Sequence, residues 1–172
     1  MLCGESKLFI GLSTGDIFMY DPFTLEMLGK TDTNRKAIPV AMVLQSTGTL
    51  LVAMHNSTIE VFSFQQSKIL PANHINNEIK VAFAGEIYSI TLSTDEICLA
   101  TFSGIFFGRF EVGPQGRPFQ VWQQSKIYLR DKTVSQILEI KPKLFLVAEY
   151  SKPGYWLVNR NEGEEEKSPI LI

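Results

Sequence analysis

The sequence offers few side chains that could carry out metal or redox chemistry. Its two histidines, His55 and His74, have no cysteine or carboxylate beside them at the spacing of metal ligands. The two cysteines, Cys3 and Cys98, are too few for a disulfide framework or a four-cysteine zinc site. We therefore predict no bound metal, and we expect both thiols to be free in a reducing compartment.

Motifs for nucleophilic catalysis and phosphate binding are missing from the sequence. There is no Gly-x-Ser-x-Gly elbow, and the glycines at 104, 108, 113 and 116 match neither the dinucleotide fingerprint nor the P-loop. The adjacent carboxylates Asp95 and Glu96 fall in a predicted turn, which favours a solvated loop over an acid–base pair. We predict no catalytic residue and no cofactor, and hence a protein that is not an enzyme.

Composition excludes several classes of protein. The 172 residues are 45% hydrophobic and 20% charged, which is not the composition of a disordered chain. The formal net charge of −2 provides no positive field for nucleic acid. No apolar stretch is long enough to cross a bilayer, and charges at Glu5 and Lys7 argue against a signal peptide. We expect a cytoplasmic protein with no membrane span.

Four internal repeats organise the chain. LFIGL (8–12), LLVAM (50–54), ICLAT (97–101) and FLVAE (145–149) each place three large apolar residues before a Gly or Ala. A short turn and a second apolar run follow each segment, and together they give repeat cores near 8–21, 50–63, 97–110 and 145–160. A period of about 45 residues is typical of stacked repeat units.

The residue types of the repeats predict strands. The runs are short, rich in Phe, Ile, Val and Tyr, and bounded by Gly, Ser, Asn and Pro. Gly15, Gly104 and Gly154 fall where a hairpin turn requires a positive φ. Further strands are expected before and after the cores, at 25–30, 38–44, 68–72, 86–92, 118–122 and 134–140. The predicted fold is all-β, with units of four antiparallel strands.

The apolar pattern within the strands indicates that both of their faces are covered. Segments such as LLVAM and LFIGL do not alternate between apolar and polar residues, as a strand with one wet face would. The Gly or Ala at the fourth position would let a neighbouring sheet approach closely. Small sheets that stack face to face around an axis, as in a β-propeller, meet this description.

The segment KLFIGLSTGDIFMYD (7–21) resembles the repeat of WD-repeat propellers, with Tyr20-Asp21 where that family places Trp-Asp. The resemblance covers about residues 7–160, but the closing dipeptide occurs only once and no Gly-His pair precedes a repeat. His74 is the candidate for the family's structural histidine. The citron-homology propeller, which also lacks regular Trp-Asp pairs, is a related possibility.

The number of predicted strands bears on the size of the propeller. We expect about fourteen strands, arranged as three, four, four and three, which amounts to about 3.5 to 4 blades. This count favours a segment of a larger propeller, spanning residues 1–162, over a self-contained ring of four blades. Residues 163–172 are expected to be an acidic tail or the start of the next blade.

Propeller geometry would place the turns between second and third strands on one rim, together with the loops that lead into the first strands. Arg and Tyr are common in interaction hot spots. The candidate partner-binding residues on this rim are Arg35, His55, Asn56, Arg130, Lys152 and Tyr155.

The WD-like resemblance implies a non-catalytic scaffold that binds other proteins through its rim loops. The alternative is a regulatory, citron-homology-like propeller of a multidomain signalling or membrane-trafficking protein. An enzymatic propeller would need carboxylates or a metal near its axis, for which the sequence offers no candidates. Self-association is expected if the propeller is incomplete.

Overall fold

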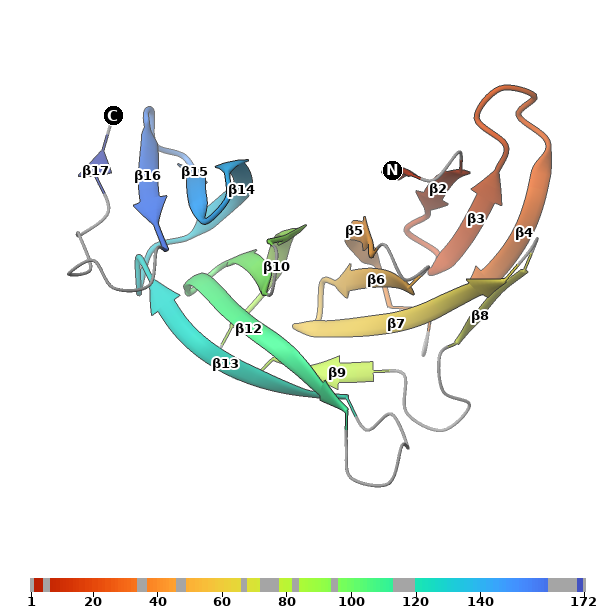
Figure 1. Ribbon diagram of the computed structural model, residues 1–172, viewed down its shortest axis with the longest axis horizontal. Coiled ribbons are helices and arrows are strands. Elements are labelled where there is room, and N and C mark those ends of the chain that lie inside the picture. The colour runs from red at the N-terminus through yellow and green to blue at the C-terminus, as the bar shows by residue number, and fades with distance from the viewer. Residues whose placement is uncertain are drawn as a thin grey trace.

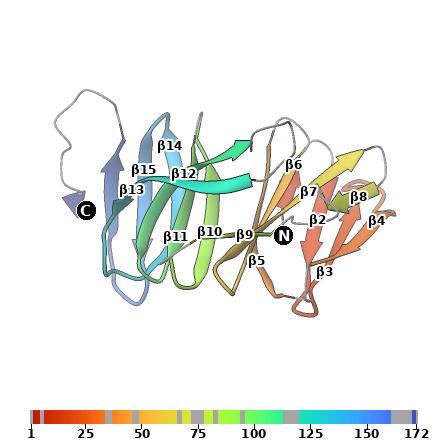
Figure 2. The ribbon, with the colours of Figure 1, turned by 90° about the horizontal axis from the view of Figure 1, so that it is seen from below.

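The computed structural model describes most of the chain, and its strands form four antiparallel sheets (Figures 1 and 2). The described residues are 2–4, 7–33, 37–45, 49–65, 68–71, 78–81, 84–93, 96–112, 120–160 and 170–171. None of these residues is helical. The all-β, antiparallel prediction is confirmed.

Sheets I and II are formed by the first half of the chain. Sheet I has the order β1-β2-β3-β4, with the strands Leu2–Gly4, Lys7–Gly11, Asp16–Tyr20 and Met27–Asp32. Sheet II has the order β5-β6-β7-β8, with the strands Pro39–Leu44, Thr49–Met54, Thr58–Gln65 and Lys68–Pro71. A fifth strand, β9 (Glu78–Lys80), also pairs with β7.

Sheets III and IV repeat this order in the second half. Sheet III consists of β10 to β13, with the strands Ile87–Leu92, Ile97–Thr101, Gly104–Val112 and Gln120–Tyr128. Sheet IV consists of β14 to β17, with the strands Val134–Lys141, Leu144–Glu149, Tyr155–Asn159 and Ile170–Leu171. The four main strands of each sheet therefore form a meander, in which each pairs with the next one along the chain, and only β9, which pairs with β7, departs from this order among the described strands.

Both end sheets have more strands than the sequence predicted. β1 pairs with β2 at Leu2↔Phe9, and β17 pairs with β16 at Leu157↔Ile170, so the count of three strands in the first and last units was wrong. Strands of two or three residues are too short to show a periodic pattern, and it is the neighbouring strand that orders them. The acidic residues 163–169 lie outside the described part of the chain.

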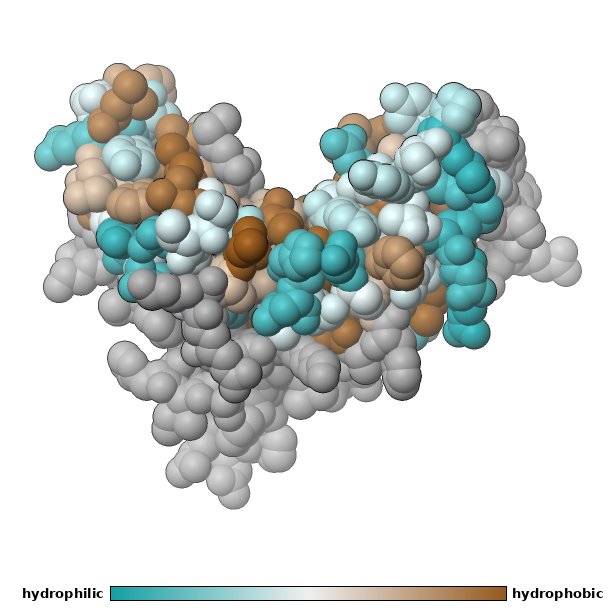
Figure 3. All heavy atoms as spheres, turned by 180° about the vertical axis from the view of Figure 1, so that it is seen from behind, coloured by the Kyte–Doolittle hydropathy of each residue, from teal (hydrophilic) through white to brown (hydrophobic). Residues whose placement is uncertain are grey.

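The four sheets are arranged along an open arc (Figure 1). The first strands of successive sheets lie on its inner side, where β1 contacts β5, β5 contacts β10, and β10 contacts β14. Sheets I and IV form two arms that are separated by a hollow, which the space-filling view shows from behind (Figure 3).

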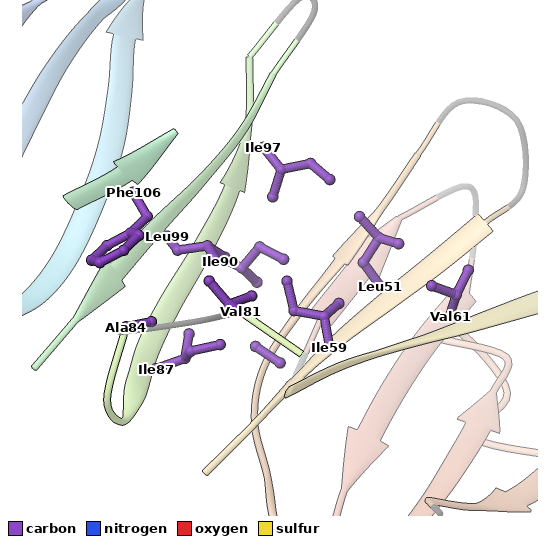
Figure 4. Close-up of a cluster of buried hydrophobic side chains, with 11 residues drawn as sticks. Leu51, Ile59, Val61, Val81, Ala84, Ile87, Ile90, Ile97, Leu99 and Phe106 are labelled. Atoms are coloured by element: carbon purple, nitrogen blue, oxygen red, sulfur yellow. The ribbon is translucent and has the colours of Figure 1, made fainter. Parts of the chain in front are cut away.

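Three apolar clusters hold neighbouring sheets together. Phe9, Ile17 and Met19 of sheet I pack with Leu50, Val52, Met54 and Phe62 of sheet II. The cluster between sheets II and III, shown in Figure 4, includes Leu51, Ile59, Val61, Ile90, Ile97, Leu99 and Phe106. Cys98, Ile105 and Phe107 pack with Phe145, Val147 and Val158 between sheets III and IV. Removal of this apolar surface from water is the main stabilising contribution to the arc.

The two middle sheets match the prediction that both faces are covered. Every residue of β11 is buried, and so is every residue of β6 except Thr49. In β3 and β15, by contrast, burial alternates, because no described part of the chain packs on the outer face of sheet I or sheet IV.

In three of the four sheets, the turn before the third strand adopts the backbone conformation that its glycine predicts. Gly15, Gly104 and Gly154 have φ values of 87°, 131° and 96°. At Gly104 a Cβ atom would also lie 2.8 Å from the carbonyl oxygen of Tyr128, so this turn excludes larger residues on two grounds.

Candidate interaction surface

Backbone hydrogen bonds bring the turns between second and third strands together with the loops that lead into the first strands. The amide of His55 donates to the Ile38 carbonyl within sheet II (3.0 Å), and the amide of Val81 donates to Ser57 (3.0 Å). The amide of Asp131, which leads into sheet IV, donates to Ser103 of sheet III (3.2 Å). We call this edge the turn rim: residues 12–15, 55–57, 102–103 and 150–154, the neighbouring residues 37–38, 84–86 and 129–133, and the residues at the adjoining strand ends, Tyr88, Glu149, Tyr155 and Trp156.

A chain of polar and aromatic contacts runs along the turn rim across three sheets. His55 Nε2 lies 3.1 Å from Glu86 Oε1, and the hydroxyl of Tyr88 donates to Glu86 Oε2 at 2.9 Å. The ring of Tyr88 stacks on Tyr150, with centroids 6.2 Å apart and planes 20° apart. Partial burial, followed by the hydrogen bond to Glu86, raises the pKa of the Tyr88 phenol. These contacts link sheets II, III and IV.

A second cluster on the rim centres on the carboxylate of Glu149. Lys152 Nζ lies 2.8 Å from Glu149 Oε1, while Lys132 Nζ and Trp156 Nε1 lie 3.8 and 3.2 Å from Oε2. The ammonium of Lys132 also lies 5.1 Å from the centroid of the Trp156 ring. The hydrogen bond from Lys152 contributes most to lowering the pKa of Glu149 below its usual value.

Large aromatic side chains project from the same rim. Phe102, Tyr150 and Tyr155 are 57%, 60% and 50% exposed. Aromatic residues beside charged ones, held on short turns, are typical of protein-binding surfaces. The arrangement can therefore bind a partner by apolar contact and charge pairing.

The structure places five of the six predicted rim residues on this edge, and Arg35 lies outside the described residues. His55, Asn56, Arg130, Lys152 and Tyr155 are all exposed. Asn56 has a local structural contact, since its Oδ1 accepts a hydrogen bond from Thr58 Oγ1 at 2.6 Å. Lys152 lies in the last turn and Tyr155 begins β16 directly after it, while His55 belongs to the network of Glu86.

Sequence reasoning missed most of the residues that connect the rim. They are Glu86, Tyr88, Phe102, Glu149, Tyr150 and Trp156. Only Phe102 and Tyr150 could have been predicted to be exposed, because each follows directly after the second strand of its repeat core. The contact of Glu86 with His55 and that of Glu149 with Lys132 join neighbouring turns and loops, which a single repeat does not reveal.

The remaining candidates for chemistry are separate from the rim. Cys98 is a free thiol that is fully buried between sheets III and IV. Among the described residues, no three His, Cys, Asp or Glu side chains are grouped to hold a metal ion. His74 and Asp95 lie outside those residues. No helix in the described part of the chain is long and apolar enough to span a membrane.

No family model and no curated protein matches the chain. Similarity is found among solved structures. The crystal structure of the computationally designed Ika4 protein has a TM-score of 0.65 at 10% identity, over 92% of this chain and 88% of that one. The computationally designed Ika8 protein has a TM-score of 0.64 at 11% identity, and the match covers 95% of this chain but only 46% of Ika8. At such low identity, the similarity concerns the fold alone.

Proposed function

We propose that this protein is a non-catalytic interaction scaffold, built from WD-like propeller repeats, that binds other proteins through the turn rim. The proposal rests on one observation above all: side chains from sheets II, III and IV meet in a connected rim network, beside exposed Phe102, Tyr150 and Tyr155. Four consecutive meanders, each with four strands paired in chain order and matching turns, support the repeat assignment.

The rigidity of the rim supports a binding role. Aromatic residues contribute most to affinity when little conformational freedom is lost on binding. Tyr150 is restrained by its stacking on Tyr88, and its amide donates to the Thr133 carbonyl at 2.7 Å. The formal net charge of −2 means that local shape and contacts, more than bulk electrostatics, would select the partner.

Affinity capture with matched variants tests this function. The rim variant carries Phe102→Ser and Tyr150→Ser. The control carries Phe23→Ser, which removes an 86% exposed aromatic residue from the turn between β3 and β4 at the opposite edge. We expect the control to retain the proteins captured by the wild-type chain and the rim variant to lose them. Capture of the same proteins by all three chains would contradict the proposal.

A further inference from the structure

The four sheets share one register in their central strands. The pair Leu8↔Tyr20 of sheet I corresponds to Leu50↔Phe62, Ile97↔Gly108 and Phe145↔Val158 in sheets II, III and IV. The next pair, Phe9↔Met19, corresponds to Leu51↔Val61, Cys98↔Phe107 and Leu146↔Leu157. Because neighbouring residues of a strand point to opposite sides, these two sets lie on opposite faces of each sheet.

The two faces have fixed partners within the chain. We call the face with the first set the N-face and the face with the second set the C-face. Phe9 and Met19 of the sheet I C-face pack on Leu50 and Phe62 of the sheet II N-face. The other two clusters repeat this arrangement, from sheet II to III and from sheet III to IV. All three interfaces thus join a C-face to the N-face of the following sheet.

One N-face and one C-face have no covering sheet in the described part of the chain. On the N-face of sheet I, Leu8, Ile10, Phe18 and Tyr20 are only half-buried, whereas Leu50, Phe62, Phe145 and Val158 at matching positions are fully buried. This face is also completed by Met27 of β4, which pairs with Tyr20 and is 56% exposed.

The C-face of sheet IV is equally apolar. Leu146 and Leu157 are half-buried there, although the matching residues of the other sheets, such as Phe9 and Phe107, are 0% exposed. Leu138 of β14 pairs with Leu146 and is 59% exposed, and Tyr155 of β16 is 50% exposed. Uncovered apolar faces of this kind mark interaction surfaces.

We propose that the C-face of sheet IV binds the N-face of sheet I of a second copy of this chain, so that two copies form a closed head-to-tail pair. One molecule carries both halves of an interface that it already forms three times internally. The two arms lie apart in one molecule (Figure 1), so the free faces are placed to meet those of another copy. Head-to-tail contacts give a closed assembly when the rotation that relates one copy to the next leads back to the first copy.

The comparison with Ika8 agrees with this arrangement at the level of fold. The match to this chain covers 46% of Ika8, so the arc of four sheets also occurs as less than half of a longer chain. In the pair, the second copy would cover Leu8, Ile10, Leu146 and Leu157. Within one chain, neighbouring sheets cover both faces of sheets II and III in the same way.

Light scattering on the full 172-residue chain, with one variant for each face, tests the pairing. Ile10→Glu introduces a charge into the N-face of sheet I, and Leu157→Glu introduces one into the C-face of sheet IV. Phe23→Glu, at an 86% exposed position in the turn between β3 and β4 and outside the strands that form the two faces, is the matched control. We expect the wild-type chain and the control to have the mass of two chains and each face variant to have the mass of one.

Mixing the two face variants distinguishes head-to-tail contact from a symmetric one. The Ile10→Glu chain keeps an intact C-face and the Leu157→Glu chain an intact N-face, so an equimolar mixture should restore a one-to-one complex. Circular dichroism checks that each variant is folded, and Ile10→Thr with Leu157→Thr provides a milder pair if one is not.

A wild-type mass of one chain, or a mass above two chains that rises with concentration, would overturn the closed pair. A folded face variant that still dimerises alone would show a symmetric contact and would overturn the head-to-tail arrangement. These readouts concern mass only, so they are independent of the capture experiment that tests the rim.

Discussion

Individual side chains of this protein owe their chemical character to burial and close partners. Cys98 and Glu149 are two examples: the surroundings of Cys98 disfavour its charged form, and those of Glu149 favour its charged form. The first is an ionisable thiol enclosed by apolar side chains such as Phe107 and Phe145, where burial disfavours its charged form. The second keeps its negative charge, since two lysines and an indole N–H surround its carboxylate.

We expect the Cys98 thiol to be unreactive in the folded protein. Burial, and then the charges of Glu96 and Glu139, raise the pKa of this thiol far above its usual value, and the reactive form is the thiolate. In a Cys3→Ser background, a disulfide reagent such as DTNB should label Cys98 only after urea unfolding. Complete labelling of the native chain at neutral pH would contradict the predicted burial.

Glu149→Gln should make stability less dependent on pH. The pKa of Glu149 is lowered from 4.5, so its ionised contacts stabilise the folded state above that pH and are lost as the pH falls through the lowered value. We expect the variant to be less stable by up to about 1 kcal/mol at neutral pH, with the difference disappearing in acid. Urea unfolding at several pH values measures it.

The exposed carboxylate of Glu26 provides the control for this experiment. Glu26→Gln should leave the pH dependence of unfolding close to that of the wild-type chain. An equal effect of both substitutions would show that the lysine contacts of Glu149 contribute nothing specific.

At the scale of the sheets, small residues decide how closely two sheets can approach. A Cβ atom at Gly11 of β2 would lie 2.7 Å from Cγ of Pro39, the first residue of β5. The corresponding residues Ala53 and Ala100 are fully buried in the next two interfaces. The fourth position of the repeat is therefore small because the following sheet packs against it, as the sequence pattern predicted.

Gly11→Ala should destabilise the chain by about 1 to 3 kcal/mol, since the rigid proline ring has to move. Adding Pro39→Ala should relieve the contact, so the double variant should lose less stability than the two single losses combined. Denaturant unfolding of all four chains measures this coupling. Additive losses would indicate that the two residues do not press on each other.

At the scale of the molecule, the arc depends on contacts between sheets as much as on those within them. Arg160, which follows β16 of sheet IV, reaches sheet III, where its Nη2 lies 3.1 Å from Glu96 Oε1 and 3.2 Å from Ser125 Oγ. Both members of this ion pair are largely buried, with side chains 18% and 12% exposed. The guanidinium also lies 5.6 Å from the centroid of the Phe107 ring.

Glu96→Gln should weaken the attachment of sheet IV to sheet III by about 1 to 3 kcal/mol, because it leaves Arg160 charged and largely buried. The double variant Glu96→Gln/Arg160→Met should recover part of this loss, as the unpaired charge is then removed. Urea unfolding of the single and double variants measures both effects. A double variant that is no more stable than Glu96→Gln would contradict the account.

The sequence predicted the strands of the repeat cores and the turns between them, since both depend on local residue types. Short apolar runs form β3, β6 and β11, and glycine supplies the positive φ of three of the four turns. In sheet II, Ser57 takes that place with a φ of 65°, and its hydroxyl donates to the Gly85 carbonyl. The sequence did not predict a serine in place of glycine at this turn, because the Gly85 carbonyl that accepts the hydrogen bond of Ser57 is distant in the chain.

What the sequence determined by itself is the all-β repeat, with its apolar central strands and the small residue at the fourth position. These features are encoded within about 15 residues of each core, where side-chain type and backbone preference act directly. Only the tertiary structure decided that β1 and β17 complete the end sheets, which faces are covered, and that Glu86 and Glu149 organise the rim. Burial and ion pairing depend on groups that meet across sheets, so a residue's neighbours along the chain do not specify them.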